Sequence, residues 1–232
     1  MNLDTFGDAS SLYRTRGEEV QLERPLFTGD VFRNVAIPET QEGGMALILA
    51  HPCSFRKPGG RLADKILVCS VQAIGREGNA AWKRGLLDRM PLPDLDGPGS
   101  WAAFFDDLGR AGVDDLLATE RLACLSDFGI NMLQQRLICH LTRAEIPTST
   151  FNEAFSHTYD EAELLEDWTV AFVEAGESAS DAVDEFETFI RSGEPRLQDL
   201  LRDPQQRFTV RRACRQQLRT LLDARRGVEG SH

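Results

Sequence analysis

The fold is decided by residues 29–72, which contain three short apolar runs separated by loops. The runs are GDVF at 29–32, MALILA at 45–50 and KILVCSVQ at 65–72. Each run has the length and the apolar content that are typical of a β-strand, and the loops between the runs contain glycine and proline. The stretch therefore predicts strands near residues 28–36, 44–51 and 64–75.

Weaker signals flank these strands. Residues 1–24 are polar and have no clear period, which predicts an irregular or partly ordered arm. A short helix is predicted between Ser100, a residue typical of helix N-caps, and Gly109, a residue typical of helix ends. The prediction rests on the helical spacing of four apolar residues, Trp101, Phe104, Phe105 and Leu108. A further strand is predicted at 121–126, followed by a helix whose apolar stripe ends near residue 141.

The chain beyond residue 150 has helical periodicity. Asp160 and Glu163 have capping-box spacing, Ser180 is a candidate cap for a second helix, and Pro204 stands at a candidate first position of a third. The sequence thus predicts an α+β protein in three parts. They are an N-terminal arm at 1–24, a small β-barrel with inserted helices at 25–150, and an α-helical C-terminal extension at 151–232.

Composition narrows the class of protein. The chain has 232 residues, 41% of them hydrophobic, and a formal net charge of −11, which argues against a general nucleic-acid coat. No apolar run approaches the roughly 20 residues that span a bilayer, and no secretory signal is evident at the N-terminus. The five cysteines are widely spaced, and none of the Cys and His spacings matches a zinc site. We therefore expect a cytoplasmic protein without membrane contact, metal or cofactor.

Charge is unevenly distributed toward the C-terminus. Residues 160–199 carry 2 basic and 13 acidic groups, whereas residues 200–232 carry 8 basic and 3 acidic groups. In the basic block four arginines recur every fourth residue, which predicts a basic stripe on the last helix: Arg207, Arg211, Arg215 and Arg219. The stripe could contact a nucleic-acid backbone, dock on the acidic helices or remain solvated. The short distance in sequence to the acidic block favours docking, with Arg211 and Arg215 in contact with acidic side chains of the same molecule.

The order of strands and helices resembles the MazF/PemK toxin family over about residues 25–145. The similarity rests on Gly29-Asp30 at the start of the first strand, on the second strand at 44–50, and on Leu125-Ser126-Asp127 before a helix. The resemblance implies a small SH3-like barrel that self-associates, a toxin–antitoxin or phage-defence context, and metal-independent RNA cleavage by the ribose 2′-hydroxyl. The arginine and threonine that such enzymes use align here with Gly44 and Val71, whose side chains cannot donate a hydrogen bond.

The loop at residues 52–61 could replace those groups. It contains three cations, Arg56, Lys57 and Arg61, together with an aromatic residue and glycines, a combination suited to a phosphate and a stacked base. These three cations are the candidate catalytic and binding residues, and Arg211 and Arg215 are further candidate binding residues. The alternative is a solvated turn whose charges have no ligand.

Two functions follow from these observations. The favoured one is a binding or interaction module on a MazF/PemK-like barrel that lacks the usual ribonuclease groups, with itself, a protein or single-stranded RNA as partner. The alternative is a metal-independent endoribonuclease that uses the basic loop. A cysteine hydrolase built on Cys53 and His51 is more distant, because no third group is evident to orient the base.

Overall fold

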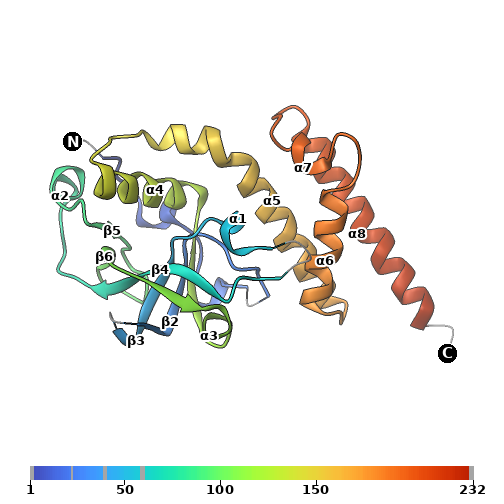
Figure 1. Ribbon diagram of the computed structural model, residues 1–232, viewed down its shortest axis with the longest axis horizontal. Coiled ribbons are helices and arrows are strands. Elements are labelled where there is room, and N and C mark those ends of the chain that lie inside the picture. Colours follow the sequence, from blue (N-terminus) through green and yellow to red (C-terminus); the bar gives the residue numbers. More distant parts are fainter. Residues whose placement is uncertain (1–2, 22, 39–40, 58–60, 230–232) are drawn as a thin grey trace. The chain divides into compact units, whose positions relative to one another are not determined.

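The computed structural model describes residues 3–21, 23–38, 41–57 and 61–229. The chain, drawn in Figure 1, divides into two compact units. The first, called here the sheet unit, comprises Met1–Leu22, Leu26–Lys57 and Leu62–Ala154. The second, called the helical unit, comprises Glu23–Pro25, Pro58–Arg61 and Phe155–His232. The fold is therefore a mixture of α and β structure, as the sequence predicted.

The sheet unit is built on seven antiparallel strands in the order β1-β7-β2-β3-β4-β6-β5. Their bounds are β1 Tyr13–Arg16, β2 Asp30–Ile37, β3 Gln41–Ile48, β4 Lys65–Ala73, β5 Arg89–Pro91, β6 Trp101–Gly112 and β7 Arg121–Leu125. The three strands predicted from residues 29–72 are thus confirmed, as is the strand at 121–126. No ladder among the described residues joins the edge strands β1 and β5, so the sheet is open and the predicted SH3-like barrel is not confirmed.

Short helical elements connect the strands, and a longer helix follows them. They are η1 Ala9–Leu12, η2 Gly17–Glu19, α1 Pro52–Phe55, α2 Asn79–Arg84, α3 Val113–Leu117 and α4 Asp127–Thr142. The helix α4 confirms the apolar stripe predicted there. Its first turn is capped by Ser126, whose hydroxyl oxygen accepts a hydrogen bond from the backbone N–H of Gly129 at 3.1 Å.

The segment after Ser100 is the strand β6, so the helix predicted there is wrong. Within the ladder to β4 the register shifts, because Phe104 faces Ser70 whereas Leu108 faces Cys69. This bulge adds residues to β6 and breaks the alternation of buried and exposed side chains. The remaining apolar spacing resembles that of a helix, but the long pairing with β4 determines the conformation, since tertiary contacts override local preference.

The N-terminal segment is more ordered than the irregular arm predicted for residues 1–24. Residues Tyr13–Arg16 form β1, an edge strand that pairs with β7, and Leu3, Leu12 and Tyr13 are buried. The pairing joins residues more than a hundred positions apart in sequence, which explains why the local pattern did not reveal it.

The Gly-Asp pair at the start of β2 has a structural role. Gly29 has φ +83°, and a Cβ added there would lie 2.8 Å from the Cβ of Leu125, so only glycine fits without a shift. The Asp30 carboxylate is fully buried and accepts a hydrogen bond from the backbone N–H of Phe27 at 2.9 Å. The same carboxylate lies 3.7 Å from the buried guanidinium of Arg121, so the pair fixes the turn into β2 and neutralises a buried cation.

Four helices form the C-terminal part of the chain: α5 Thr148–Glu174, α6 Ala179–Ile190, α7 Leu197–Leu200 and α8 Arg207–Glu229 (Figure 1). None of the helices in the described part of the chain has both the length and the apolar content needed to cross a bilayer. Within the helical unit, Trp168 of α5 occupies the core. Its ring centroid lies 6.0 Å from that of Phe172, 5.6 Å from that of Phe186 and 5.8 Å from that of Phe189.

The helix starts differ from those predicted. Because α5 begins at Thr148, Asp160 lies in the middle of this helix and does not cap it. Its carboxylate binds arginines of α8 instead. Ser178, not Ser180, caps α6 by accepting hydrogen bonds from two backbone N–H groups of the first turn. The helix α8 begins at Arg207, a turn later than the start predicted at Pro204.

Candidate functional site

The helix α8 has one face in the core of the helical unit. Val210 and Cys214 are buried there, and Leu218 and Leu221 pack against the same core. These residues recur at intervals of three to four, which is the spacing of one face of an α-helix. Burial raises the pKa of the Cys214 thiol to about 11, so this cysteine is an inert core residue at neutral pH.

Arginines at the border of this face are held by acidic side chains. Arg211 donates to Asp160 at 2.6 Å and also to Glu163, which confirms the predicted docking of this residue. Burial acts to lower the pKa of Arg211, but the hydrogen bonds to the two carboxylates outweigh it, and the pKa is raised. Arg225 is paired in the same way, at 2.6 Å from Glu177.

Arg207 is the third arginine that is held within the unit. Its guanidinium lies 3.2 Å from the Asp160 carboxylate and donates to the Ser156 hydroxyl at 2.8 Å. Arg207, Arg211 and Arg225 therefore tie α8 to its neighbours in the helical unit and have little capacity left for a ligand.

The next arginines along α8 are exposed. With 3.6 residues per turn, each step of four residues rotates the side chain by about 40°, so a row that begins at Arg207 leaves the packed face within about two turns. Arg215 and Arg219 are accordingly exposed, as is Arg212 beside them. Among the described residues no acidic side chain forms an ion pair with Arg215, so the contact predicted for it is not found.

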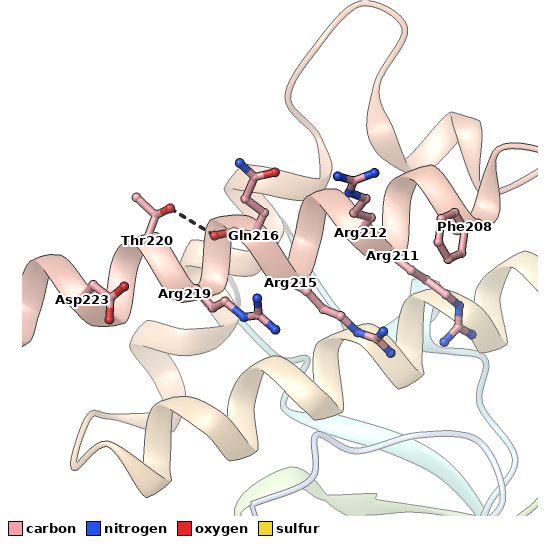
Figure 2. Close-up of a pocket in the computed structure, with 8 residues that line it drawn as sticks. All are labelled: Phe208, Arg211, Arg212, Arg215, Gln216, Arg219, Thr220 and Asp223. Carbon is pink, nitrogen blue, oxygen red and sulfur yellow. Dashed lines mark hydrogen bonds between the residues drawn. The ribbon is translucent and has the colours of Figure 1, made fainter.

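These arginines share their face of α8 with an exposed aromatic ring. Phe208 is 74% exposed and lies at the N-terminal end of a shallow depression of about 520 Å³. Figure 2 looks onto this depression, where Arg215 and Arg219 extend to one side and Arg212 to the other. We call Phe208, Arg212, Arg215 and Arg219 the arginine face. The exposure of Phe208 could have been predicted from sequence, because its position on the helix falls outside the apolar stripe.

The arginine face is electrostatically unfavourable in isolation. Arg215 stands four residues from Arg219, and like charges at this spacing destabilise a helix by about 0.2–0.5 kcal/mol per pair. Asp223 is the one acidic residue among those lining the depression, at its far end. A bound anion would relieve this repulsion, and guanidinium groups bind phosphate and carboxylate through paired hydrogen bonds.

The basic loop is only partly accounted for by structural contacts. Arg56 donates from Nη2 to the carbonyl of Leu26 at 2.9 Å, and its guanidinium carbon lies 5.9 Å from the ring centroid of Phe27. Lys57 is exposed, residues 58–60 lie outside the described part of the chain, and Arg61 is exposed in the helical unit. Arg56 thus has a structural contact, and a joint site of Arg56, Lys57 and Arg61 stays a prediction.

Two other sequence candidates have defined surroundings. The Nδ1 atom of His51 accepts a hydrogen bond from the backbone N–H of Cys53 at 3.2 Å, so His51 caps α1 with the atom that could have received a thiol proton. Gly44 and Val71 lie on the adjacent strands β3 and β4, where Met45 pairs with Val71. Val71 is buried, which leaves it no access to a substrate.

Comparison with known proteins gives a weak likeness among solved structures. No family model matches the chain, and no curated protein matches it. Among solved structures, an endoribonuclease from a mycobacterial species is similar with a TM-score of 0.35 and 14% sequence identity, over 51% of this chain and 91% of that chain. A likeness of this size does not establish membership of a family.

Proposed function

We propose that this protein is a single-stranded RNA-binding module that contacts RNA through the arginine face of α8. The single observation that carries the proposal is that three exposed arginines and an exposed phenylalanine line the same depression along α8. The proposal includes a MazF/PemK-like barrel without the usual ribonuclease groups, acting in the cytoplasm in a toxin–antitoxin or phage-defence context.

The chemistry of the face favours a single strand as ligand. Residues four apart on a helix are separated by about 6 Å along its axis, which allows successive guanidinium groups to reach different phosphates. The ring of Phe208 offers a stacking surface, and a base is available for stacking only when it is unstacked from its neighbours. A duplex would satisfy the arginines but leave the exposed ring without a partner.

The overall charge limits how RNA binds. The formal net charge of −11 and the acidic block at residues 160–199 repel a polyanion from most of the chain. Contact confined to α8 gives a short footprint, moderate affinity and a modest dependence on salt. Cleavage by the basic loop is the less favoured alternative, because the Arg56 guanidinium already binds the Leu26 carbonyl.

The test measures fluorescence anisotropy of a short labelled single-stranded RNA with the parent protein and a variant of the arginine face. The variant replaces three exposed residues by glutamine: Arg212, Arg215 and Arg219. The matched control removes the same charge from three exposed arginines outside α8: Arg84, Arg196 and Arg202. We expect binding to be lost in the first variant and kept in the control. Equal binding by the parent and the α8 variant would refute the proposal.

A further inference from the structure

The sheet unit contains a pocket that has no part in the α8 surface. It has a volume of about 490 Å³, which lies in the range of small-molecule sites. Three segments line it: residues near the N-terminus, the stretch that follows β4 into α2, and the β5–β6 connection. Its lining includes Phe6, Arg76, Glu77, Asn79, Asp94 and Trp101.

The wall formed by the β5–β6 connection is fixed by backbone hydrogen bonds. Leu92 donates to the carbonyl of Trp101 at 2.8 Å, and Ile74 donates to that of Ser100 at 2.9 Å. The Tyr13 hydroxyl donates to the carbonyl of Pro93 at 2.9 Å, and burial raises the pKa of this phenol, so it remains a donor. The backbone that carries Trp101 is therefore held in place before any ligand binds.

The opposite wall is anchored by a buried arginine of α4. Arg136 has no exposed surface, and it donates to the backbone carbonyls of Trp82 at 3.0 Å and Asp4 at 3.2 Å. Its guanidinium carbon also lies 5.7 Å from the ring centroid of Trp82. Burial lowers the pKa of Arg136 to about 10, and the group stays charged at neutral pH. The N-terminal segment and α2 are thus tied to α4, which makes the pocket preformed.

The lining combines a flat apolar surface with a mixed polar edge. Trp101 is half-buried, and Phe6 and prolines of the β5–β6 connection extend the apolar surface. At the rim, Arg76 can only donate hydrogen bonds, Glu77 can only accept them, and Asn79 can do both. A planar ring whose edge carries donors as well as acceptors would satisfy Glu77 and Asn79, and an anionic group on the same ligand would satisfy Arg76. A proline-rich peptide, in contrast, has few N–H groups to offer Glu77.

From this arrangement we infer that the pocket binds one nucleotide, either free or as a unit of an RNA chain. The base stacks on Trp101, its donor-bearing edge faces Glu77 and Asn79, and Arg76 binds the phosphate. Because the lining carries one cation, Arg76, and two carboxylates, Glu77 and Asp94, the site suits a monophosphate better than a more highly charged ligand. The inference does not depend on the arginine face, which belongs to the helical unit.

The first arm of the test titrates the four nucleoside 5′-monophosphates into the full chain by isothermal titration calorimetry. We expect saturable binding of at least one of them, weakened about 10-fold or more by Trp101→Ala through loss of stacking. Trp101→Phe keeps an aromatic surface and should retain most of the affinity, which separates stacking from a folding defect. Glu77→Gln replaces an acceptor-only group by an amide and should change the preference among bases.

The second arm distinguishes the two sources of the nucleotide. If the monophosphates fail to bind but a short single-stranded RNA binds in a manner sensitive to Trp101→Ala and Glu77→Gln, the site reads one unit of an RNA chain. Both measurements are repeated with the α8 variant, which should leave the pocket unchanged and so tests the pocket independently of the proposed function. Absence of saturable binding in both arms, or binding that is insensitive to both substitutions, would overturn the inference.

Discussion

Two arginines four residues apart on α8 should respond in opposite ways to the same substitution. Arg215 is exposed, and no ion pair joins it to another described residue, whereas Arg211 is bound to Asp160 and Glu163. We expect Arg215→Gln to weaken RNA binding and leave thermal stability unchanged. Arg211→Gln should lower the melting temperature, because Glu163 loses its arginine partner and Asp160 keeps only Arg207, and should have much less effect on binding.

The magnitude follows from counterion release. Each contact with a phosphate of a single strand contributes about −0.7 to the slope of log K against log salt concentration, so three arginines give about −2.1. Between about 50 and about 200 mM salt the parent should then lose about 18-fold in affinity, and Arg215→Gln, with two contacts left, about 7-fold. Fluorescence anisotropy over this range gives both slopes.

A slope that Arg215→Gln leaves unchanged would contradict this prediction. Such a result would mean that RNA, if bound, is held elsewhere on the chain. A slope reduced by Arg211→Gln as much as by Arg215→Gln would show that the ion pairs to α5 open when RNA binds. That outcome would contradict the division of α8 into a packed border and an arginine face.

Four further predictions concern other groups. Phe208→Ala should weaken RNA binding by about 1–3 kcal/mol, the range for one stacked base, without lowering the melting temperature, because the ring is 74% exposed; anisotropy and calorimetry check both. Burial and then the charge of Arg202 lower the pKa of His157, so below the ordinary value of 6.5 the unfolded chain binds more protons than the folded chain and stability is lost as the pH falls. The melting temperature of His157→Gln should therefore drop less than that of the parent between neutral pH and mildly acidic pH. The apolar content of residues 100–145 predicts self-association, and light scattering that shows a monomer at micromolar concentration would contradict it. If RNA is cleaved at all, cutting in EDTA should fall about 10²–10³-fold on alanine substitution in the loop 52–61, and unchanged cutting would place the site elsewhere.

Much of the sheet could be predicted from sequence because its strands carry local signals. β2, β3 and β4 are short apolar runs bounded by turn residues, and such patterns specify strands without knowledge of the partners. β1 and β6 carry no such signal. β1 is a short strand whose partner β7 is far away in sequence, and the bulge between Phe104 and Leu108 gives β6 an apolar spacing that imitates a helix.

The candidate sites were predictable to different degrees. The periodic arginines of α8 identified the correct helix, but the contacts of Arg211 differ from those of Arg215 because an every-fourth-residue row rotates around the axis. A helical projection of the sequence shows this rotation, so the different positions of Arg211 and Arg215 could be predicted from it. The pocket beside Trp101 could not be predicted, because three segments distant in sequence line it and the segment that forms β6 was predicted to be a helix.

Four arginines elsewhere in the chain show how a guanidinium with a structural role is held, although other arginines, such as Arg84 and Arg196, are also exposed. Arg121 is buried beside Asp30, Arg136 binds backbone carbonyls, Arg56 binds the carbonyl of Leu26, and Arg211 binds carboxylates of α5. In each case a guanidinium has a partner that accounts for its position. On the arginine face three exposed guanidinium groups line the same depression as an exposed ring, and among the described residues none of the three forms an ion pair, although Asp223 lies at the far end of the depression. An anionic ligand would relieve the repulsion between these arginines, and this makes α8 the first place to look for such a ligand.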